Sequence, residues 1–217
     1  MRQRVLVGCE FSGIVREAFR RRGHDAWSCD LLAAEDGSPH HLQCDVRDVI
    51  DGGWDLAIFH PPCTHLAVSG ARYFADKIAD GRQRRALDFV CALLDAPVPR
   101  IALENPVSII SSRIRPPDQV IQPWMFGHDA SKATCLWLKK LPPLKPTRII
   151  RKDRYANQTA SGQNRLGPSP DRWKLRSRFY EGVAEAMADQ WPDAEMHLDL
   201  WGSAMKSRRT SDVKRPA

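Results

Sequence analysis

Residues 56–66 read LAIFHPPCTHL, and in this stretch an apolar run meets two prolines and a cysteine. The apolar run predicts a buried strand, because it has no polar alternation. Proline has no backbone N–H and a fixed φ, so the strand should end there and present Cys63 rigidly. Ligands of an open α/β sheet bind at the carboxyl ends of its strands. Cys63 is therefore placed like a nucleophile.

Apolar segments on either side of this stretch predict an α/β fold. Strands are expected over 4–9, 26–29, 42–46, 54–60, 99–103 and 134–138, and helices over 14–22, 82–94 and 179–191. Ser12 is expected to cap the first helix, which should end at Gly23. Alternating strands and helices predict a Rossmann-like, mostly parallel sheet with helices on both faces. One domain should span residues 1–201, and residues 202–217 should form a disordered basic tail.

The composition is that of an ordinary globular protein. The chain has 217 residues, of which 42% are hydrophobic and 27% charged. No apolar run approaches the roughly 18 residues of a membrane span, and the amino terminus has no signal-peptide pattern. Six cysteines are scattered without a CxxC pair. This favours a reducing compartment, the cytoplasm, over a disulfide scaffold or a zinc ribbon.

Positive charge is concentrated in one segment. The net charge is +7, and residues 139–178 contain twelve Lys or Arg but only two acids. A solvated basic face would explain such a run, but aromatic and amide side chains are interleaved with the charges, as at Tyr155. That mixture suits phosphates and base edges, so we expect nucleic acid as the partner. We expect segment 139–178 to be irregular and to contact substrate through Arg154, Arg165, Arg172 and Lys174.

Five features with chemical potential fall where predicted strands end. A turn with Gly13 follows the first strand and precedes a helix N-terminus, a common place for a ligand. Asp30 follows the second strand, where an acid either holds ribose hydroxyls or caps a helix. Asp45 follows the third strand and is ambiguous alone. Cys63 follows the fourth strand, and Glu104-Asn105-Pro106 follows the fifth.

The order and spacing of these features resemble the DNA cytosine-5 methyltransferases over most of residues 4–138. Pro62-Cys63 is similar to that family's Pro-Cys nucleophile, and Glu104-Asn105 is similar to its Glu-Asn pair. The motifs His-Pro-Pro-Cys-Thr and Glu-Asn-Pro resemble those of a compact phage-type branch of this family. The resemblance implies an S-adenosylmethionine-dependent methyltransferase fold in a bacterial or phage-infected cell. It also implies methyl transfer to C5 of cytosine in DNA.

The resemblance also implies roles for individual residues. Cys63 would add to C6 of a base flipped out of the duplex, and C5 would then attack the methyl group. Glu104 would hydrogen-bond the ring, with Pro62 and Asn105 beside the base. Asp30 would bind the ribose and Asp45 the adenine of S-adenosylmethionine. The cofactor residues implied are Glu10, Phe11, Ser12, Gly13, Asp30, Leu31, Asp45, Val46 and Pro61.

Three departures from the family pattern concern substrate recognition. The Gln-x-Arg-x-Arg strand is not evident, and residues 132–135 (Lys-Ala-Thr-Cys) occupy its place. The usual Gly-Asn opening of the last helix is also absent. The large target-recognition domain is missing, and only segment 139–178 could replace it. We therefore expect a short target sequence, or a homodimer that enlarges the footprint on DNA.

Several alternatives stay open at this point. The same fold could act on RNA or a free cytosine nucleotide, transfer a modified methyl group, or serve as a non-catalytic DNA-binding protein. Cys63 could be a structural thiol, or it could ligate a metal with His60 and His65. A zinc deaminase is excluded, because the chain has no His-x-Glu with Pro-Cys-x-x-Cys. The biological role, whether restriction-modification, phage DNA protection or regulation, does not follow from the sequence.

Overall fold

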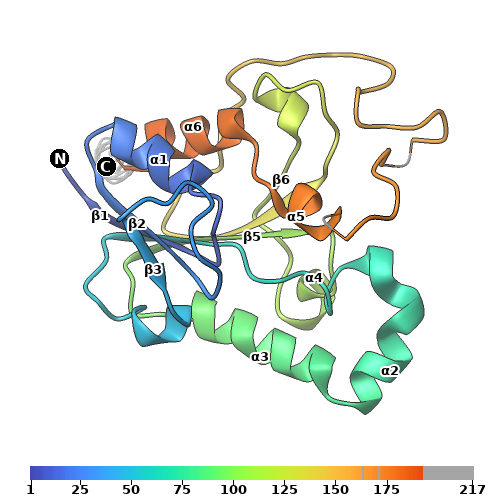
Figure 1. Ribbon diagram of the computed structural model, residues 1–217, viewed down its shortest axis with the longest axis horizontal. Helices are drawn as coiled ribbons and strands as arrows, with labels where there is room; N and C mark the ends of the chain where they lie inside the picture. The colour runs from blue at the N-terminus through green and yellow to red at the C-terminus, as the bar shows by residue number, and fades with distance from the viewer. Residues whose placement is uncertain (163, 171, 193–217) are drawn as a thin grey trace, which may run out of the picture.

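A single mixed sheet organises the chain. The computed structural model describes residues 1–162, 164–170 and 172–192 (Figure 1). The strands are β1 (Arg4–Gly8), β2 (Asp25–Asp30), β3 (His41–Gln43), β4 (Leu56–Phe59), β5 (Arg100–Pro106), β6 (Gln119–Ile121) and β7 (Thr134–Lys139). The helices are α1 (Ile14–Arg21), α2 (Phe74–Ala79), α3 (Arg82–Leu94), α4 (Ile110–Arg113), α5 (Arg172–Ser177) and α6 (Glu181–Gln190). Short 3-10 turns occur at Val46–Asp48, Val68–Tyr73 and Pro123–Met125.

The strand order is β3-β2-β1-β4-β5-β7-β6. Strands β1 to β5 pair in parallel, whereas β7 is antiparallel to both β5 and β6. The predicted α/β class and mostly parallel sheet are therefore confirmed. The first five strands have the doubly wound order, in which the sheet grows in one direction from β1 and in the other from β4. The carboxyl ends of β1 and β4 thus meet at a topological switch point, the usual place for a ligand.

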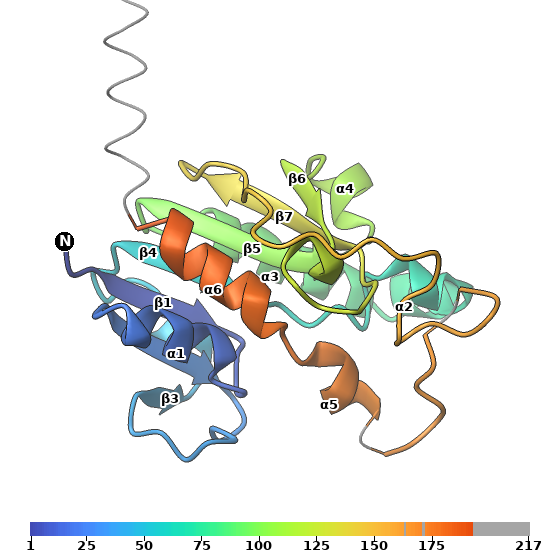
Figure 2. The same ribbon diagram turned by 90° about the horizontal axis from the view of Figure 1, so that it is seen from above.

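Two apolar layers enclose the sheet. Val5 and Val7 of β1 join the core under α1 and α6, whereas Leu6 points into the core under α3. This alternation follows from the two-residue period of a strand, and both faces are apolar because both are covered. Figures 1 and 2 show α6 beside α1 on one face of the sheet and α3 on the other. The predicted placement of helices on both faces is confirmed.

Helix α6 is fixed by unusually close packing at both ends. A Cβ on Gly182 would lie 2.0 Å from the Phe126 carbonyl oxygen, so only glycine allows this approach. At the other end Trp191 is fully buried, and its indole N–H donates to the Pro142 carbonyl at 3.0 Å. The buried Arg100 guanidinium also donates to the Trp191 carbonyl at 3.1 Å. The chain therefore returns to the sheet after segment 139–178 and is held there.

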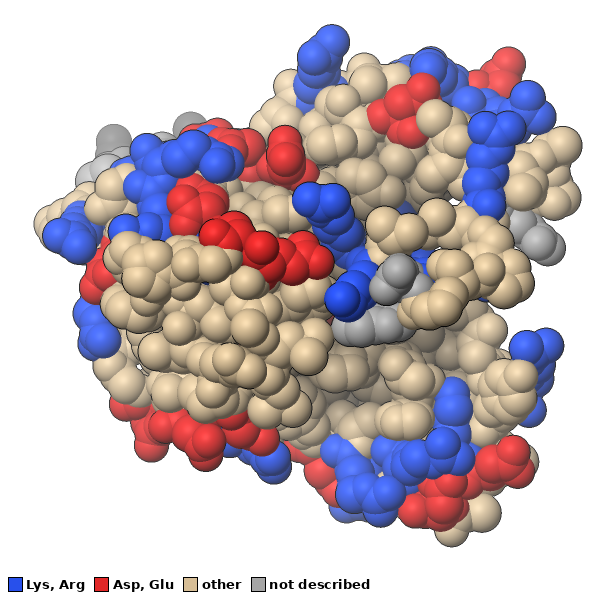
Figure 3. Space-filling view, in the orientation of Figure 1, with Lys and Arg blue, Asp and Glu red and all other residues tan. Residues whose placement is uncertain are grey.

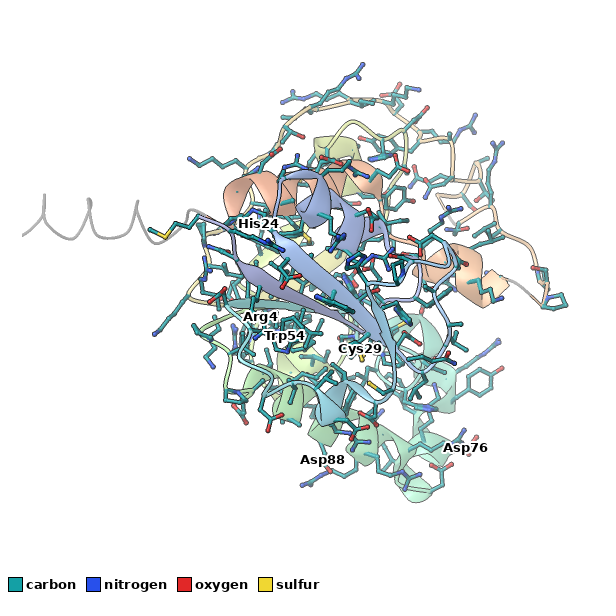
Figure 4. The ribbon with its side chains drawn as sticks, turned by 60° about the vertical axis from the view of Figure 1, so that its left-hand side comes forward. Arg4, His24, Cys29, Trp54, Asp76 and Asp88 are labelled. Atoms are coloured by element: carbon teal, nitrogen blue, oxygen red, sulfur yellow. The ribbon has the colours of Figure 1, made fainter. Side chains whose placement is uncertain are left out.

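The amino ends of the central strands β1 and β4 are held by local contacts. The Arg4 guanidinium lies 4.8 Å from the centre of the Trp54 ring, and Figure 4 shows the two side chains together. Arg4 also donates to the Gly52 carbonyl at 2.7 Å. These contacts fix the entry into β4 at the amino end, away from the strand ends where ligands bind.

Several elements differ from the sequence prediction. β6, α2, α4 and α5 were not predicted, because each is three to six residues long and lacks a clear apolar period. The third strand ends at Gln43 instead of Val46, since Asp45 caps a 3-10 turn there. Apart from α5, segment 139–178 is largely irregular, as expected. The tail predicted over 202–217 lies outside the described residues.

None of the helices in the described part of the chain has the length and apolar character that crossing a membrane requires.

We expect Trp191→Ala to lower the free energy of unfolding by about 3–5 kcal/mol, because it leaves a large cavity between α6 and the sheet. Ile149→Ala, at a half-exposed site in the basic segment, should change it by no more than about 0.5 kcal/mol. Urea titration followed by circular dichroism measures both values. Equal effects of the two substitutions would show that α6 does not anchor the end of the domain.

Candidate active site

The register of β4 and β5 brings two polar residues together at the switch point. Phe59 pairs with Leu103, so His60, the first residue after β4, and Glu104 stand at the same level. Glu104 does not follow the fifth strand, as predicted, but lies within it, because β5 continues to Pro106 by pairing with β7. Nδ1 of His60 lies 3.4 Å from Oε2 of Glu104. Glu104 is only 8% exposed, so a carboxylate is held nearly out of solvent at the edge of the sheet.

The loop that presents Cys63 is held by side-chain hydrogen bonds. The buried Asn105 amide donates to the Pro61 carbonyl at 2.9 Å. After the prolines, the Cys63 carbonyl accepts from the backbone N–H groups of Leu66 and Ala67 at 3.0 and 2.9 Å. The buried Lys77 ammonium of α2 also donates to the Thr64 carbonyl at 2.6 Å. The loop is thus fixed from both sides of Cys63.

Two cations face the Cys63 thiol. Burial and the negative charge of Glu104 raise the pKa of Cys63, whereas the charges of Lys132 and Arg176 lower it, and the net shift is upward. Lys132 precedes β7, and its ammonium donates to the Arg176 carbonyl of α5 at 3.1 Å. The resting thiol is therefore neutral at pH 7, with two cations in place to stabilise a thiolate.

Glu104 is kept ionised despite its burial. Burial raises the pKa of its carboxyl, but hydrogen bonds from His60 and Thr134 and the charge of Lys132 outweigh this and bring the pKa below its usual value. Lys132 and Thr134, before and at the start of β7, thus both act on Glu104. Their contribution was not apparent from composition, which marks Lys132 only as a surface charge.

A small pocket opens beside the Glu104 carboxylate and is closed by the start of α6. The residues that line it are Glu104, Ile121, Pro123, Lys132, Thr134, Phe179, Tyr180 and Val183. The Phe179 ring lies 4.8 Å from that of His60, centre to centre. At about 10 Å³ the pocket has room for no more than one water molecule, so a larger group could reach the carboxylate only if the start of α6 moved.

Glu10, predicted to bind cofactor, is turned into the first helix. Its carboxylate accepts from the backbone N–H groups of Val15 and Arg16 at 2.7 and 3.2 Å, and it is 5% exposed. Ser12, predicted to be the cap, is one residue too early: the N-cap is Gly13, with a φ of 72°. The Ser12 hydroxyl donates to Glu10 at 3.3 Å and accepts from the Ile14 N–H at 3.4 Å. Both Glu10 oxygens are therefore committed to the N-terminus of α1.

The other predicted cofactor residues divide into two groups. Asp30 uses one oxygen to accept from the Leu32 N–H at 2.9 Å, and the neighbouring Leu31 is 70% exposed. Asp45, in contrast, caps the next turn and is held by the Arg47 guanidinium at 2.6 Å, which with the hydrogen bond lowers its pKa to about 2. Val46 is buried. Asp30 and Leu31 are thus available to a ligand, whereas Asp45 is already neutralised.

The predicted substrate contacts in segment 139–178 are spread along it. Arg154 and Lys174 are exposed, and Arg165 donates to the Ala156 carbonyl at 3.3 Å. Nε of Arg172 is buried without a hydrogen-bond partner among the described residues. Of these residues, only Arg172 and Lys174 belong to α5, the helix that brings Arg176 toward Cys63. Arg176 itself was missed, since nothing in the sequence separates it from its neighbours.

Basic side chains gather on both sides of this region. Figure 3 shows Lys and Arg at the upper right, over segment 139–178, and at the lower right, over α2 and the start of α3. The lower group is partly neutralised, because Arg82 pairs with Asp80 and Arg84 with Asp88. Mainly uncharged surface lies between the two groups. A polyanion would therefore meet its strongest attraction along segment 139–178.

Within the described residues, no group of three or more His, Cys, Asp or Glu side chains is arranged to hold a metal ion. Comparison with protein-family models and with curated protein sequences finds no match for the chain.

Removing a charged group near Cys63 should change the pH at which its thiol becomes reactive. Glu104→Gln removes a negative charge that raises the Cys63 pKa, so half-maximal alkylation by iodoacetamide should occur at lower pH than in the wild type. Lys132→Gln removes a positive charge, so it should occur at higher pH. Peptide mass spectrometry distinguishes Cys63 from the other cysteines, with Asp118→Asn as a remote control. Shifts in the same direction for both variants would contradict this electrostatic account.

Glu10→Ala should destabilise the fold by about 1–3 kcal/mol, because two buried N–H groups lose their acceptor. Asp30→Ala, which removes a more exposed carboxylate, should cost less than about 1 kcal/mol. Thermal and urea denaturation give the two values. A smaller cost for Glu10→Ala than for Asp30→Ala would disprove the capping role.

Proposed function

We propose that this protein is an S-adenosylmethionine-dependent methyltransferase that modifies C5 of cytosine in DNA through a covalent Cys63 adduct. One observation carries the proposal. A fixed cysteine follows β4, a buried, ionised carboxylate stands on the adjacent β5, and the charges of Lys132 and Arg176 act on the thiol. Cytosine C5 chemistry requires this combination, a nucleophile for C6 together with a group that binds the ring edge.

Cys63 has the nucleophilic role. Its thiolate forms the bond to C6, the C5=C6 π pair moves to C4–C5, and the C4=N3 pair takes a proton at N3. C5 is then nucleophilic. After C5 is methylated, loss of the C5 proton restores the C5=C6 bond and releases Cys63 as thiolate. Lys132 and Arg176 stabilise the thiolate before addition and after release.

Glu104 binds the ring edge in this proposal. Its carboxylate accepts from the exocyclic amino group, which thymine lacks, and so selects cytosine. The recess beside Glu104 holds only about 10 Å³, so Phe179 and Tyr180 would have to move to admit the ring, which would then lie against their aromatic side chains. Asn105 acts through the Pro61 carbonyl and keeps the Cys63 loop at the level of Glu104. Pro62 is exposed beside the thiol and would contact the base.

S-adenosylmethionine would supply the electrophilic methyl group. The residues at the strand ends fit it in part. Asp30 has a carboxylate oxygen suited to ribose hydroxyls, and exposed Leu31 beside it suits the apolar face of adenine. The turn at Phe11 to Gly13 lies at a helix N-terminus and brings backbone close to the ligand. Asp45 does not fit the adenine role, because Arg47 holds its carboxylate.

The choice of DNA follows from the charge of segment 139–178 and from its link to the site through Arg176. Neither C5 nor C6 can be reached by Cys63 in a stacked duplex, so the base would be flipped out. The basic segment would hold the flanking phosphates. A homodimer that enlarges this footprint stays a prediction.

Expression of the protein in cells should add 5-methylcytosine to their DNA, and Cys63→Ala should abolish it. Nucleoside mass spectrometry measures the modified base, with Cys91→Ser on α3 as the control that retains activity. Duplex DNA, RNA and dCMP assayed with the purified protein distinguish the substrate classes. A different cytosine mass would show that the transferred group is not a plain methyl. Modification by Cys63→Ala at the wild-type rate would overturn the covalent mechanism.

A duplex containing 5-fluorocytosine provides a second, independent test. Fluorine at C5 cannot leave as a proton, so the Cys63 adduct should accumulate after methyl transfer and survive denaturing electrophoresis. Cys91→Ser should trap the duplex as well as the wild type, and Cys63→Ser should not trap it. DNA binding with no trapped complex and no methylation would indicate a non-catalytic DNA-binding protein.

A further inference from the structure

His60 lies beside a buried carboxylate at the end of β4. Its Nδ1 faces Oε2 of Glu104 at 3.4 Å, and its ring packs against Phe179. Burial raises the pKa of Glu10, and a positive charge on His60 would oppose that rise. Nε2 of His60 is buried and has no hydrogen-bond partner in the described part of the chain. An imidazole in contact with a buried carboxylate can orient that carboxylate or exchange a proton with it.

The tautomer of His60 follows from its neighbour. An ionised carboxylate only accepts hydrogen bonds, so the nitrogen that faces Glu104 bears a hydrogen. Nε2 is then the nitrogen that gains or loses the second proton. The charged groups close to this ring are Glu10 after β1 and Glu104 on β5, with Lys132 acting on Glu104 from β7. From the side of α6 it meets the uncharged Phe179 ring.

The proposed reaction requires a proton that Glu104 does not hold at rest. Addition of the Cys63 thiolate to C6 places an electron pair on N3, and N3 must be protonated for C5 to become enamine-like. Glu104 faces N3 but is ionised in the resting site. The proton must therefore come through Glu104 from a donor behind it, and His60 is in contact with Oε2.

We propose that His60 is a positioning residue that orients Glu104 and passes it the proton that N3 of cytosine takes up when Cys63 adds to C6. The inference rests on the proposed function. In this relay the imidazolium gives its Nδ1 proton to Glu104 as Glu104 gives one to N3, which leaves neutral His60 with the proton on Nε2. When Cys63 departs, the N3 proton returns through Glu104 to His60, and the C5 proton is lost to solvent.

The relay predicts a particular pH dependence. It requires protonated His60 and deprotonated Cys63, two demands that oppose each other as the pH rises. The single-turnover rate constant should therefore rise at low pH, level off as the two demands offset each other, and fall only above the pKa of Cys63. A site that needed only the thiolate would continue to gain rate up to the Cys63 pKa.

His60→Asn separates the two roles of the side chain. The asparagine amide can still donate to Glu104 from the position of Nδ1, but it cannot release a proton. His60→Asn should lower the plateau rate constant by roughly 10²-fold or more and abolish the levelling-off. His60→Ala, which also loses the orienting hydrogen bond, should be slower still. His24→Asn, a histidine before β2 at the amino end of the sheet (Figure 4), should leave rate and profile unchanged.

The measurement is single-turnover formation of 5-methylcytosine in plasmid DNA between pH 5.5 and about 9.5, quantified by nucleoside mass spectrometry. The relay is supported if the wild type is active and its rate constant levels off with rising pH, while the rate constant of His60→Asn rises over the whole range. Active wild type with the same profile in His60→Asn would overturn the relay and leave the proposed function intact. An inactive wild type on DNA, RNA and dCMP would overturn both.

Discussion

The hydrogen bond from the Asn105 amide to the Pro61 carbonyl fixes the geometry on which the candidate site depends. Proline has no N–H, so the chain after β4 cannot be held by continuing the strand ladder. A buried side chain on the adjacent β5 supplies the bond instead, from the position next to Glu104. Cys63 and Glu104 are thereby held by the same pair of strands. Their separation depends on strand register, the most rigid relation available in a sheet.

Three ionisable groups of the site are largely removed from solvent: Glu10, Glu104 and the Cys63 thiol. The N-terminus of α1 binds the Glu10 carboxylate, and His60 and Lys132 favour the ionised form of Glu104. The charges of Lys132 and Arg176 favour the thiolate of Cys63. Lys132 therefore serves two anions. Because it also binds the Arg176 carbonyl, any shift of α5 changes the charge around both the carboxylate and the thiol.

The sequence was sufficient for those parts of the fold that have a strong period. β1, β4 and β5 have apolar centres, α1 lies between Gly13 and Gly23, and α3 begins after Gly81, so the positions of these elements could be predicted. Helices α2 and α5 have no such signal, because few of their residues are buried. Arg176 and Lys132 reach the site through tertiary packing of irregular segments, which no local pattern encodes. The hydrogen bonds from the backbone N–H groups of residues 15 and 16 to Glu10 could not be predicted either, because Ser12 was expected to cap the helix and the N-cap is Gly13.

In the proposed function, segment 139–178 would serve both substrate binding and chemistry. Segment 139–178 leaves the sheet at β7 and returns at α6, both of which are firmly packed, so it forms a closed excursion from the core. Its inner end includes Arg176, whose charge acts on the Cys63 thiol, and its outer part carries exposed cations such as Arg154. In the proposed function, a polyanion bound by the outer cations would also act on α5. Substrate binding and activation of the thiol would then be coupled through one segment.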